Sequence, residues 1–315
     1  MRVAITGGTG FVGRHLAREL VARGHEVILI ARGKDLRDES IYKLAGASFF
    51  ASDLSDAQEL RRAFSGCEAV AHCAGINREI GPQTYRRVHM EGTQNVVEAA
   101  RQAGVRKIVL LSFLRARPNC GSAYHESKWA AEETVRASGL DCTIFKAGVI
   151  YGHGDHMLDH LSHALYTFPV FGLVGVREKP IRPLAVGDLV VAIRASFEDA
   201  RLSNKTVSIT GPEEIALGEA VRRVGYVIQR NPLYVPTPLA IQKIIAWVAE
   251  HIMKIPLLSL AQLRILSEGI VEALPPCDSL PADLLPPTRF TSKQIQEGLP
   301  EAGPFGLRDL RCCKG

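Results

Sequence analysis

The first 32 residues constrain the fold of this chain more than any other stretch. A short apolar run, Arg2 to Ile5, leads into the segment Thr6-Gly7-Gly8-Thr9-Gly10-Phe11-Val12-Gly13. An amphipathic stretch from Arg14 to Arg23 follows, and Gly24 separates it from a second apolar run, Glu26 to Ile30. This order predicts a strand, a sharp glycine turn, a helix and a second strand. Two parallel strands joined by a helix belong to a sheet that helices cover.

The spacing of the glycines is that of a dinucleotide-binding turn. Gly8, Gly10 and Gly13 form the pattern G-x-G-x-x-G, and Gly7 begins an overlapping G-x-x-G-x-x-G. Without side chains, backbone N–H groups can approach a pyrophosphate, and the positive end of the helix dipole favours an anion there. We therefore predict that residues 6–13 bind a cofactor. A structural turn without a ligand is the alternative, and the flanking strand and helix disfavour it.

The residues after the second strand indicate which cofactor binds. An acidic residue there would bind a ribose 2′-hydroxyl, whereas this chain has Ala31-Arg32-Gly33-Lys34, whose charge suits a 2′-phosphate. NADP is therefore predicted in preference to NAD. NAD stays open because Asp35 follows closely and could reach a ribose, and Arg32 could instead be a solvated loop residue.

Composition excludes several other classes of protein. The chain has 315 residues, of which 46% are hydrophobic and 23% charged, as in ordinary globular proteins. Its net charge of +5 is not concentrated in one block, so no nucleic-acid partner is predicted. No 18-residue apolar run and no signal peptide are recognised. The seven cysteines include no C-x-x-C pair and are odd in number, which favours reduced thiols and a cytoplasmic location.

Strands and helices continue to alternate after Arg32. The pattern predicts strands at 47–51, 69–73, 107–111 and 142–145, and helices at 56–64, 84–103 and 122–138, with Ser55 and Gln58 as a capping box. The strands are apolar on both faces. The fold class predicted is therefore α/β, a Rossmann-type doubly wound parallel sheet.

Ligands bind such sheets at the carboxyl ends of the strands. Arg32, Asp53-Leu54, Ala74-Gly75, Ser112 and Lys146-Ala147 follow directly after predicted strands. Topology alone makes these residues candidates for the site.

Tyr124 and Lys128 add a chemical function to the predicted cofactor site. They lie four positions apart in a predicted helix, so they share one face. A nearby ammonium lowers the pKa of a phenol by favouring the phenolate, which makes the phenol a better proton shuttle. Ser112 would bind and orient the same substrate oxygen. Unrelated residues on a helix surface are the alternative interpretation of this pair.

Together, the glycine turn, the serine and the Tyr-x-x-x-Lys motif resemble the short-chain dehydrogenase/reductase superfamily over about the first 190 residues. The resemblance implies that Tyr124 is the general acid/base and that Lys128 lowers its pKa and binds the nicotinamide ribose. It also implies that Ser112 positions a carbonyl or hydroxyl, that Asp53 meets the adenine, and that Ala74-Gly75 lines the cofactor.

Four further segments, 88–95, 146–155, 181–188 and 210–213, resemble landmarks of the extended and atypical, epimerase/dehydratase-like branch. Within it, the chain is most similar to relatives of the nucleotide-binding accessory subunit of respiratory complex I. Two positions depart from the sugar-modifying members. His89 stands where they have Asn, and Lys146-Ala147 replaces their Arg-Pro beside the nicotinamide. His89 is interpreted as a structural residue rather than a catalytic one.

The predicted dinucleotide-binding domain comprises residues 1–150 and 181–210, and a smaller, mostly helical substrate or lid region comprises 151–180 and 211–315. In the latter, 239–254 predicts an amphipathic helix with Ile241, Ile244, Ile245, Val248 and Ile252 largely on one half. The favoured interpretation is a lid over the substrate cleft or a subunit contact. The alternative is a peripheral membrane contact with Trp247 and the lysines at the headgroups.

His156, His160 and His163 would share one face if their segment is helical, a spacing that could bind zinc. No fourth ligand is identified and the redox chemistry needs no metal, so no metal is predicted and a pocket helix is favoured.

The function predicted is an NADP-preferring oxidoreductase that transfers a hydride at a carbonyl or alcohol of a small-molecule substrate, with an apolar substrate as one alternative. A cofactor-binding sensor or scaffold without turnover is the second hypothesis, and a nucleotide-sugar epimerase or dehydratase is the third. Neither the substrate nor the oligomeric state can be inferred from the sequence.

Overall fold

A computed structural model describes residues 1–33, 36–253, 258–301 and 303–306. Lys34, Asp35, Lys254, Cys312 and Cys313, which entered the sequence analysis, lie outside the described residues. The chain forms two compact units. Unit 1 comprises Met1–Ala147, Val186–Ile209 and Glu272–Leu285, and unit 2 comprises Gly148–Ala185, Thr210–Val271 and Pro286–Gly315.

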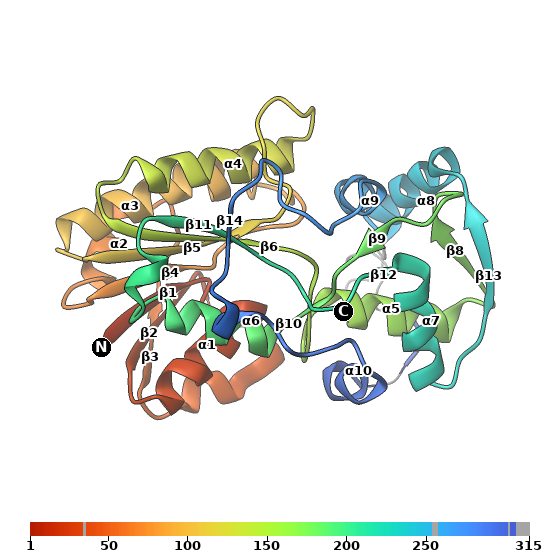
Figure 1. Ribbon diagram of the computed structural model, residues 1–315, viewed down its shortest axis with the longest axis horizontal. Coiled ribbons are helices and arrows are strands. Elements are labelled where there is room, and N and C mark those ends of the chain that lie inside the picture. The colour runs from red at the N-terminus through yellow and green to blue at the C-terminus, as the bar shows by residue number, and fades with distance from the viewer. Residues whose placement is uncertain (34–35, 254–257, 302, 307–315) are drawn as a thin grey trace. The chain divides into compact units, whose positions relative to one another are not determined.

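Unit 1 is built on a parallel sheet of eight strands in the order β14-β11-β6-β5-β4-β1-β2-β3 (Figure 1). The strands are β1 (Arg2–Thr6), β2 (Glu26–Ala31), β3 (Ala47–Ala51), β4 (Ala69–His72), β5 (Lys107–Phe113), β6 (Asp141–Ala147), β11 (Lys205–Ile209) and β14 (Asp278–Ser279). The strand order reverses beside β1, which follows β4 in space and precedes β2. The carboxyl ends of β1 and β4 therefore adjoin the point where such sheets bind ligands.

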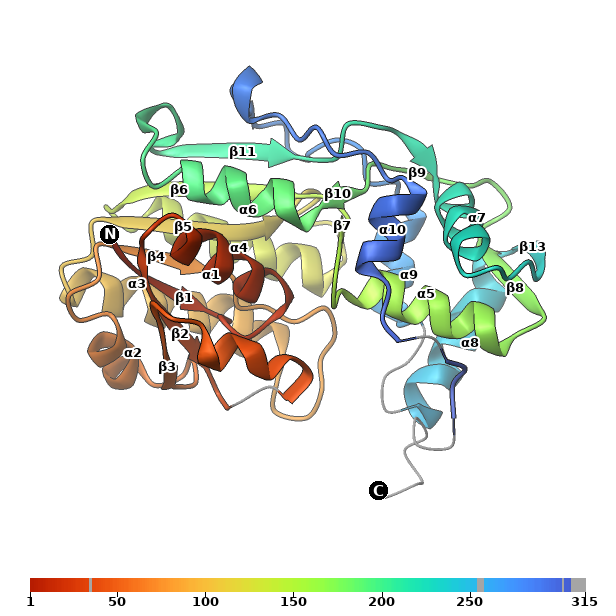
Figure 2. The ribbon, with the colours of Figure 1, turned by 90° about the horizontal axis from the view of Figure 1, so that it is seen from below.

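Helices cover both faces of this sheet (Figure 2). They are α1 (Phe11–Ala22), α2 (Ala57–Ala63), α3 (Gly92–Gln102), α4 (Ala123–Arg136) and α6 (Val186–Ala195). The neighbours α2, α3 and α4 lie on one face, and α1 and α6 pack together on the other. The predicted α/β, doubly wound Rossmann-type fold is confirmed.

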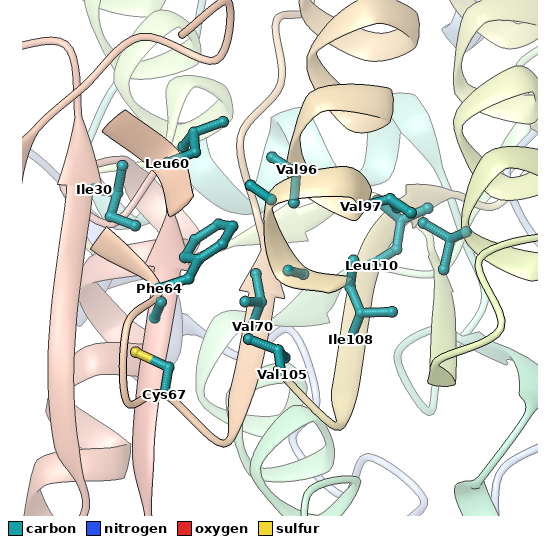
Figure 3. Packing of buried hydrophobic residues seen from close by; sticks show 14 of the residues in the cluster. Ile30, Leu60, Phe64, Cys67, Val70, Val96, Val97, Val105, Ile108 and Leu110 are labelled. Carbon is teal, nitrogen blue, oxygen red and sulfur yellow. The ribbon is translucent and has the colours of Figure 1, made fainter. Parts of the chain in front are cut away.

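Alternation along the strands produces the core between the sheet and α2, α3 and α4. Ala4, Ile28, Val70 and Ile108 occupy adjacent register positions on one face. They belong to a buried cluster with side chains of the helices, including Phe64 and Val96 (Figure 3). Because alternate side chains of β2, β5 and β6 enter this cluster, the register of these strands is fixed by burial.

Local details differ from the predictions at two helix starts. Asp56, not Ser55, caps α2, and its carboxylate accepts a hydrogen bond from the Glu59 N–H at 3.0 Å. The long helix predicted from Thr84 is divided, because Arg86–Glu91 forms a π-helical turn (η2) before α3 begins at Gly92. Such a wide turn is often found at functional sites, and this one carries His89.

Unit 2 has short strands and five helices among its described residues. The strands are β7 (Ile150–Tyr151), β8 (Val170–Val174), β9 (Pro180–Ile181), β10 (Leu184–Ala185), β12 (Ile215–Ala216) and β13 (Leu233–Thr237). The helices are α5 (His156–Thr167), α7 (Leu217–Val227), α8 (Leu239–Ile252), α9 (Leu260–Ser267) and α10 (Ser292–Gly298). They surround three two-stranded sheets, β10-β7, β12-β9 and β13-β8.

The observed units differ from the predicted domain limits mainly in two segments. Residues 272–285 lie in unit 1, because Asp278 and Ser279 pair with Val207 and Ser208 of β11 and extend the sheet. Residues 181–185 lie in unit 2, because their strands pair with β12 and β7. Both differences depend on pairing between distant segments, which no local pattern indicates.

No described helix is both long and apolar enough to cross a membrane.

Candidate active site

Three of the four glycines in the turn at the end of β1, Gly7, Gly10 and Gly13, have distinct structural roles. Gly7 has φ +68°, a conformation in which other residues are strained, and a Cβ on it would lie 2.8 Å from the Ala74 backbone. A Cβ on Gly13 would lie 2.2 Å from the Gly7 carbonyl oxygen, so Gly13 permits close packing of α1 on the turn. At Gly10 only the Gly7 oxygen, at 3.1 Å, would be near.

The contacts at Gly10 fit a dinucleotide. It is the N-cap of α1, has no side chain of its own, and accepts the Arg14 N–H at 3.0 Å through its carbonyl. The first N–H groups of a helix lack intrahelical partners and attract anions. Because nothing but the turn itself approaches the missing Cβ of Gly10, a pyrophosphate can come within hydrogen-bonding distance there. Gly8 is required as well, because a Cβ on it would lie 2.9 Å from the Ile5 carbonyl oxygen and from the Leu29 Cα, so the turn uses the glycines of both overlapping patterns.

Lys128, which lies on α4 together with Tyr124, contacts the segment that follows β4, next to the glycine turn. A Cβ on Gly75 would lie 3.0 Å from the Lys128 Nζ, so the ammonium lies against the Gly75 backbone. The ammonium donates to the Leu111 carbonyl at 3.3 Å. Burial lowers the pKa of Lys128 to about 8. Since Gly7 packs on Ala74, the predicted cofactor residues Gly7, Ala74 and Gly75 and the predicted catalytic Lys128 form one continuous site.

A buried hydrogen-bond chain links the glycine turn to η2. The Thr93 hydroxyl donates to the His89 carbonyl at 2.5 Å, so its oxygen accepts from His72 Nε2 at 3.0 Å. His72 Nδ1 then accepts from the Thr6 hydroxyl at 2.6 Å. Burial, followed by the charge of Lys128, lowers the pKa of His72 to about 3. The imidazole is therefore neutral, and each group in this hydrogen-bond chain has one assigned role as donor or acceptor in each bond.

His89 holds the loop after β4 against α4. Its Nε2 accepts the Ile76 N–H at 3.1 Å, so its Nδ1 carries the proton and donates to the Ser127 hydroxyl at 2.9 Å. Ser127 in turn donates to the Tyr124 carbonyl at 2.9 Å. Burial holds the pKa of His89 well below its ordinary value. His89 thus fixes the helix turn that carries Tyr124, a structural task consistent with its interpretation from sequence.

His72, Thr93 and Ser127 belong to this site but were not predicted from the sequence. Each had a weak signal: a histidine inside an apolar strand, a threonine within segment 88–95, and a serine between Tyr124 and Lys128.

Tyr124 lies in a cluster of rings. It is 7% exposed, and its ring centroid lies 5.4 Å from that of Phe113, 5.6 Å from Tyr85 and 5.8 Å from His89. Burial, followed by the neighbouring Tyr85, raises the pKa of Tyr124 above its ordinary value. The direction of this shift is opposite to the lowering by Lys128 that the sequence predicts, because burial disfavours the charged phenolate.

Ser112 belongs to a different buried cluster. Its hydroxyl donates to Glu132 Oε1 at 2.5 Å, and the Lys146 ammonium contacts both carboxylate oxygens at 3.1 and 3.3 Å. Arg136 binds the second oxygen at 2.7 Å. Glu132 and Lys146 are 0% and 1% exposed. The Ser112 hydroxyl therefore donates its proton to Glu132. Lys146 was predicted to lie beside the nicotinamide, but its ammonium instead neutralises the Glu132 carboxylate.

The remaining predicted cofactor residues lie at strand ends. Arg32 is exposed directly after β2. Asp53 accepts the Ser55 N–H at 2.9 Å, and the Leu54 carbonyl accepts from the Asn95 amide at 2.8 Å. Thr9 is buried in the glycine turn, and Phe11 and Val12 open α1.

The three histidines of the predicted shared face do lie on α5. The rings of His156 and His160 are 5.7 Å apart, whereas His163 contacts the Gly303 carbonyl at 2.6 Å and Asp159 at 3.3 Å. In the described part of the chain, no three His, Cys, Asp or Glu side chains are grouped to hold a metal ion.

Comparisons with known proteins find similarity to nucleotide-binding proteins. A family model described as NAD(P)H-binding matches residues 7–158. The ceramide reductase of Caulobacter vibrioides is 37% identical over 157 residues, 49% of this chain and 47% of that protein. NADH dehydrogenase (ubiquinone) 1 alpha subcomplex subunit 9, mitochondrial, of Mus musculus is 26% identical over 240 residues, 75% of this chain and 63% of that one. The match thus spans about half of the first relative and under two thirds of the second.

Among solved structures, the UDP-glucose 4-epimerase of Thermus thermophilus in complex with NAD has a TM-score of 0.63 at 24% identity. The match covers 76% of this chain and 86% of that one. At this identity the likeness concerns the fold alone.

The fold and the glycine turn define a dinucleotide-binding protein of the Rossmann type. Residues 7–158, slightly less than half of the chain, carry the similarity to the family model of NAD(P)H-binding proteins. The resemblance found in the sequence, including that to the accessory subunit of complex I, is confirmed.

Proposed function

We propose that this protein is an NAD(P)-dependent reductase of carbonyl compounds in which Tyr124 donates the proton. The observation that carries the proposal is the joint placement of Tyr124 and Lys128 on α4, with the Lys128 ammonium against Gly75 at the edge of the glycine turn. The similarity to a ceramide reductase supports an apolar carbonyl substrate.

The raised pKa of Tyr124 favours reduction over oxidation. A phenol whose pKa is raised by burial stays protonated at neutral pH, so it can donate a proton but is a poor base. Carbonyl reduction needs such a donor, since the carbonyl oxygen gains negative charge as a hydride arrives at the carbon. A bound nicotinamide dinucleotide would supply that hydride. Phe113 and Tyr85 pack against the Tyr124 ring, and a donor held in such an apolar environment would stabilise the developing charge more strongly than one in water.

Lys128 makes the activity dependent on pH. Below its pKa of about 8 the ammonium is charged and stabilises negative charge at the site, and above that pKa the charge is lost. For the best substrate in a panel of ketones, aldehydes and quinones, kcat/KM should be constant below neutrality. It should fall by about tenfold per pH unit above the Lys128 pKa. A Lys128→Arg variant that retains activity should keep its plateau to higher pH. A profile that instead falls toward acid pH would contradict this assignment.

Arg32 is proposed to bind the 2′-phosphate of NADP. It is exposed at the carboxyl end of β2, and charge-assisted bonds from a guanidinium to a phosphate are among the strong ones. We expect Arg32→Ala to raise the Kd for NADPH about 10- to 100-fold, measured by cofactor fluorescence, and to leave the Kd for NADH within about twofold. Arg61→Ala, an exposed arginine on α2, serves as the control and should alter neither. Equal losses for the two cofactors would rule out 2′-phosphate recognition.

The second candidate function is a cofactor-binding sensor or scaffold without turnover. Two observations favour it: the Ser112 proton is committed to Glu132, and the chain is similar to a subunit of NADH dehydrogenase. Tight NAD(P)H binding with no oxidation of the cofactor across the carbonyl panel would support this function over the reductase.

A further inference from the structure

Helix α8 of unit 2 turns its apolar half outward. Ile244 is 64% exposed, Trp247 54%, Ile245 53%, Ile241 50% and Ile252 49%. Leu239 and Val248 are each 38% exposed. The spacing of Ile241, Ile244, Ile245, Val248 and Ile252 is that of one helical face. A helix of this composition ordinarily packs that face against the core, so its exposure needs an explanation.

The inner side of α8 fixes this orientation. Its two buried residues are Gln242 and Ala246. The Gln242 amide donates to the carbonyls of Gly172 and Leu173 in β8, at 3.1 and 2.8 Å. Rotating the apolar half inward would break both bonds and bury aliphatic side chains against backbone carbonyls. The exposed half, which we name the α8 face (Ile241, Ile244, Ile245, Trp247, Val248 and Ile252), is therefore a stable feature of unit 2.

The chemistry of the α8 face fits hydrocarbon better than protein. Its six side chains expose on the order of 600 Å², as large as the largest apolar patch on a typical monomer. Apart from the Trp247 indole N–H they offer no hydrogen-bonding group, whereas protein interfaces carry about one hydrogen bond per 100–200 Å². A stable dimer also buries about 800 Å² from each partner, more than this face presents.

The edge of the α8 face resembles a helix lying in the surface of a bilayer. Lys243 and Trp247 lie one turn apart along one flank, and Lys243 is exposed. A lysine places its ammonium at headgroup level while its stem covers apolar surface, and tryptophan prefers the same depth. The positive charge of the exposed Lys243 beside this face suits an anionic surface. With 14 residues the helix is too short to span the hydrocarbon core, so it would lie flat.

We propose that the α8 face inserts into the surface of a membrane containing anionic lipid and holds the protein there as a peripheral protein. The inference rests on unit 2 alone and is independent of the proposed reductase activity. Membrane attachment would also bring the protein to any substrate dissolved in the bilayer.

The test uses the full chain and two kinds of vesicle, phosphatidylcholine alone and phosphatidylcholine with phosphatidylglycerol. We expect flotation with the second kind, weaker at high salt, and a blue shift of Trp247 emission recorded in a Trp129→Phe background. Ile244→Glu should weaken binding by about tenfold or more, because it places a charge at the centre of the inserted face. Leu285→Glu is the matched control, since Leu285 is 55% exposed in unit 1, and it should bind as the unchanged protein does.

Three results would overturn the proposal. The first is no flotation with either vesicle, and the second is equal binding by Ile244→Glu and the unchanged protein. The third is a dimer in sedimentation velocity without lipid that Ile244→Glu dissociates, which would assign the α8 face to a second copy of the chain.

Discussion

A Tyr124→Phe variant is expected to lose about 100- to 10,000-fold in kcat for carbonyl reduction while its Kd for NADPH changes by less than about threefold. The substitution removes the phenolic proton and leaves the ring, so the contacts with Phe113, Tyr85 and His89 persist. Steady-state kinetics on the best carbonyl substrate and cofactor fluorescence give the two quantities separately.

Tyr85→Phe is the matched control for this experiment. Tyr85 belongs to the same ring cluster, and its hydroxyl donates to the Asn77 carbonyl at 2.9 Å. Loss of the Tyr85 hydroxyl should change kcat by only a few-fold, because this hydroxyl donates its proton to the loop after β4 and not to a substrate. If Tyr124→Phe kept full turnover, the acid role of Tyr124 would be wrong. An unchanged protein that binds NADPH but reduces nothing would instead point to the sensor or scaffold.

Glu132→Ala is expected to lower the free energy of unfolding by about 3–5 kcal/mol. Glu132 is fully buried and accepts from Ser112, Lys146 and Arg136. Removing the carboxylate leaves the Lys146 ammonium, which is 1% exposed, without its counterion. An uncompensated buried charge costs far more than the loss of an ordinary contact. Urea unfolding followed by circular dichroism measures the change.

The neighbouring residue provides the control. Glu133 also pairs with Arg136, but its side chain is 55% exposed, so Glu133→Ala should cost less than about 1 kcal/mol. The double variant Glu132→Ala, Lys146→Met should recover most of the stability lost in Glu132→Ala, because it removes the stranded charge along with its partner. Equal effects of the two single variants, or no recovery in the double variant, would show that charge burial is not the cause.

Much of unit 1 could be predicted because its signals are local. The run from β1 through the glycine turn to β2 needs only strand propensity, glycine spacing and an amphipathic helix, and all three lie within 32 residues. Tyr124 and Lys128 were identified because four positions on a helix define a shared face. The hydrogen bond of Ser112 could not be predicted in this way, because its acceptor, Glu132, lies on another element, 20 positions away.

The ionisation of the site required the assembled fold. From the sequence, Lys128 should lower the pKa of Tyr124, yet burial among Phe113, Tyr85 and His89 raises it. Desolvation depends on how many segments close around a group, and a motif contains no information about that. The buried hydrogen-bond chain from Thr6 through His72 to Thr93 could not be predicted from a motif either. Thr6 and His72, which are hydrogen-bonded, lie 66 positions apart in the sequence.

The sequence by itself determined the α/β class, the glycine turn and the placement of Tyr124 and Lys128 one turn apart on one helix, because each depends on residues a few positions apart. Only the tertiary structure decided that Ser112 serves Glu132, that residues 272–285 complete the sheet of unit 1, and that α8 presents its apolar half to the outside. These outcomes are set by contacts between distant segments. Their energies arise from burial and charge pairing that exist only after the chain has folded.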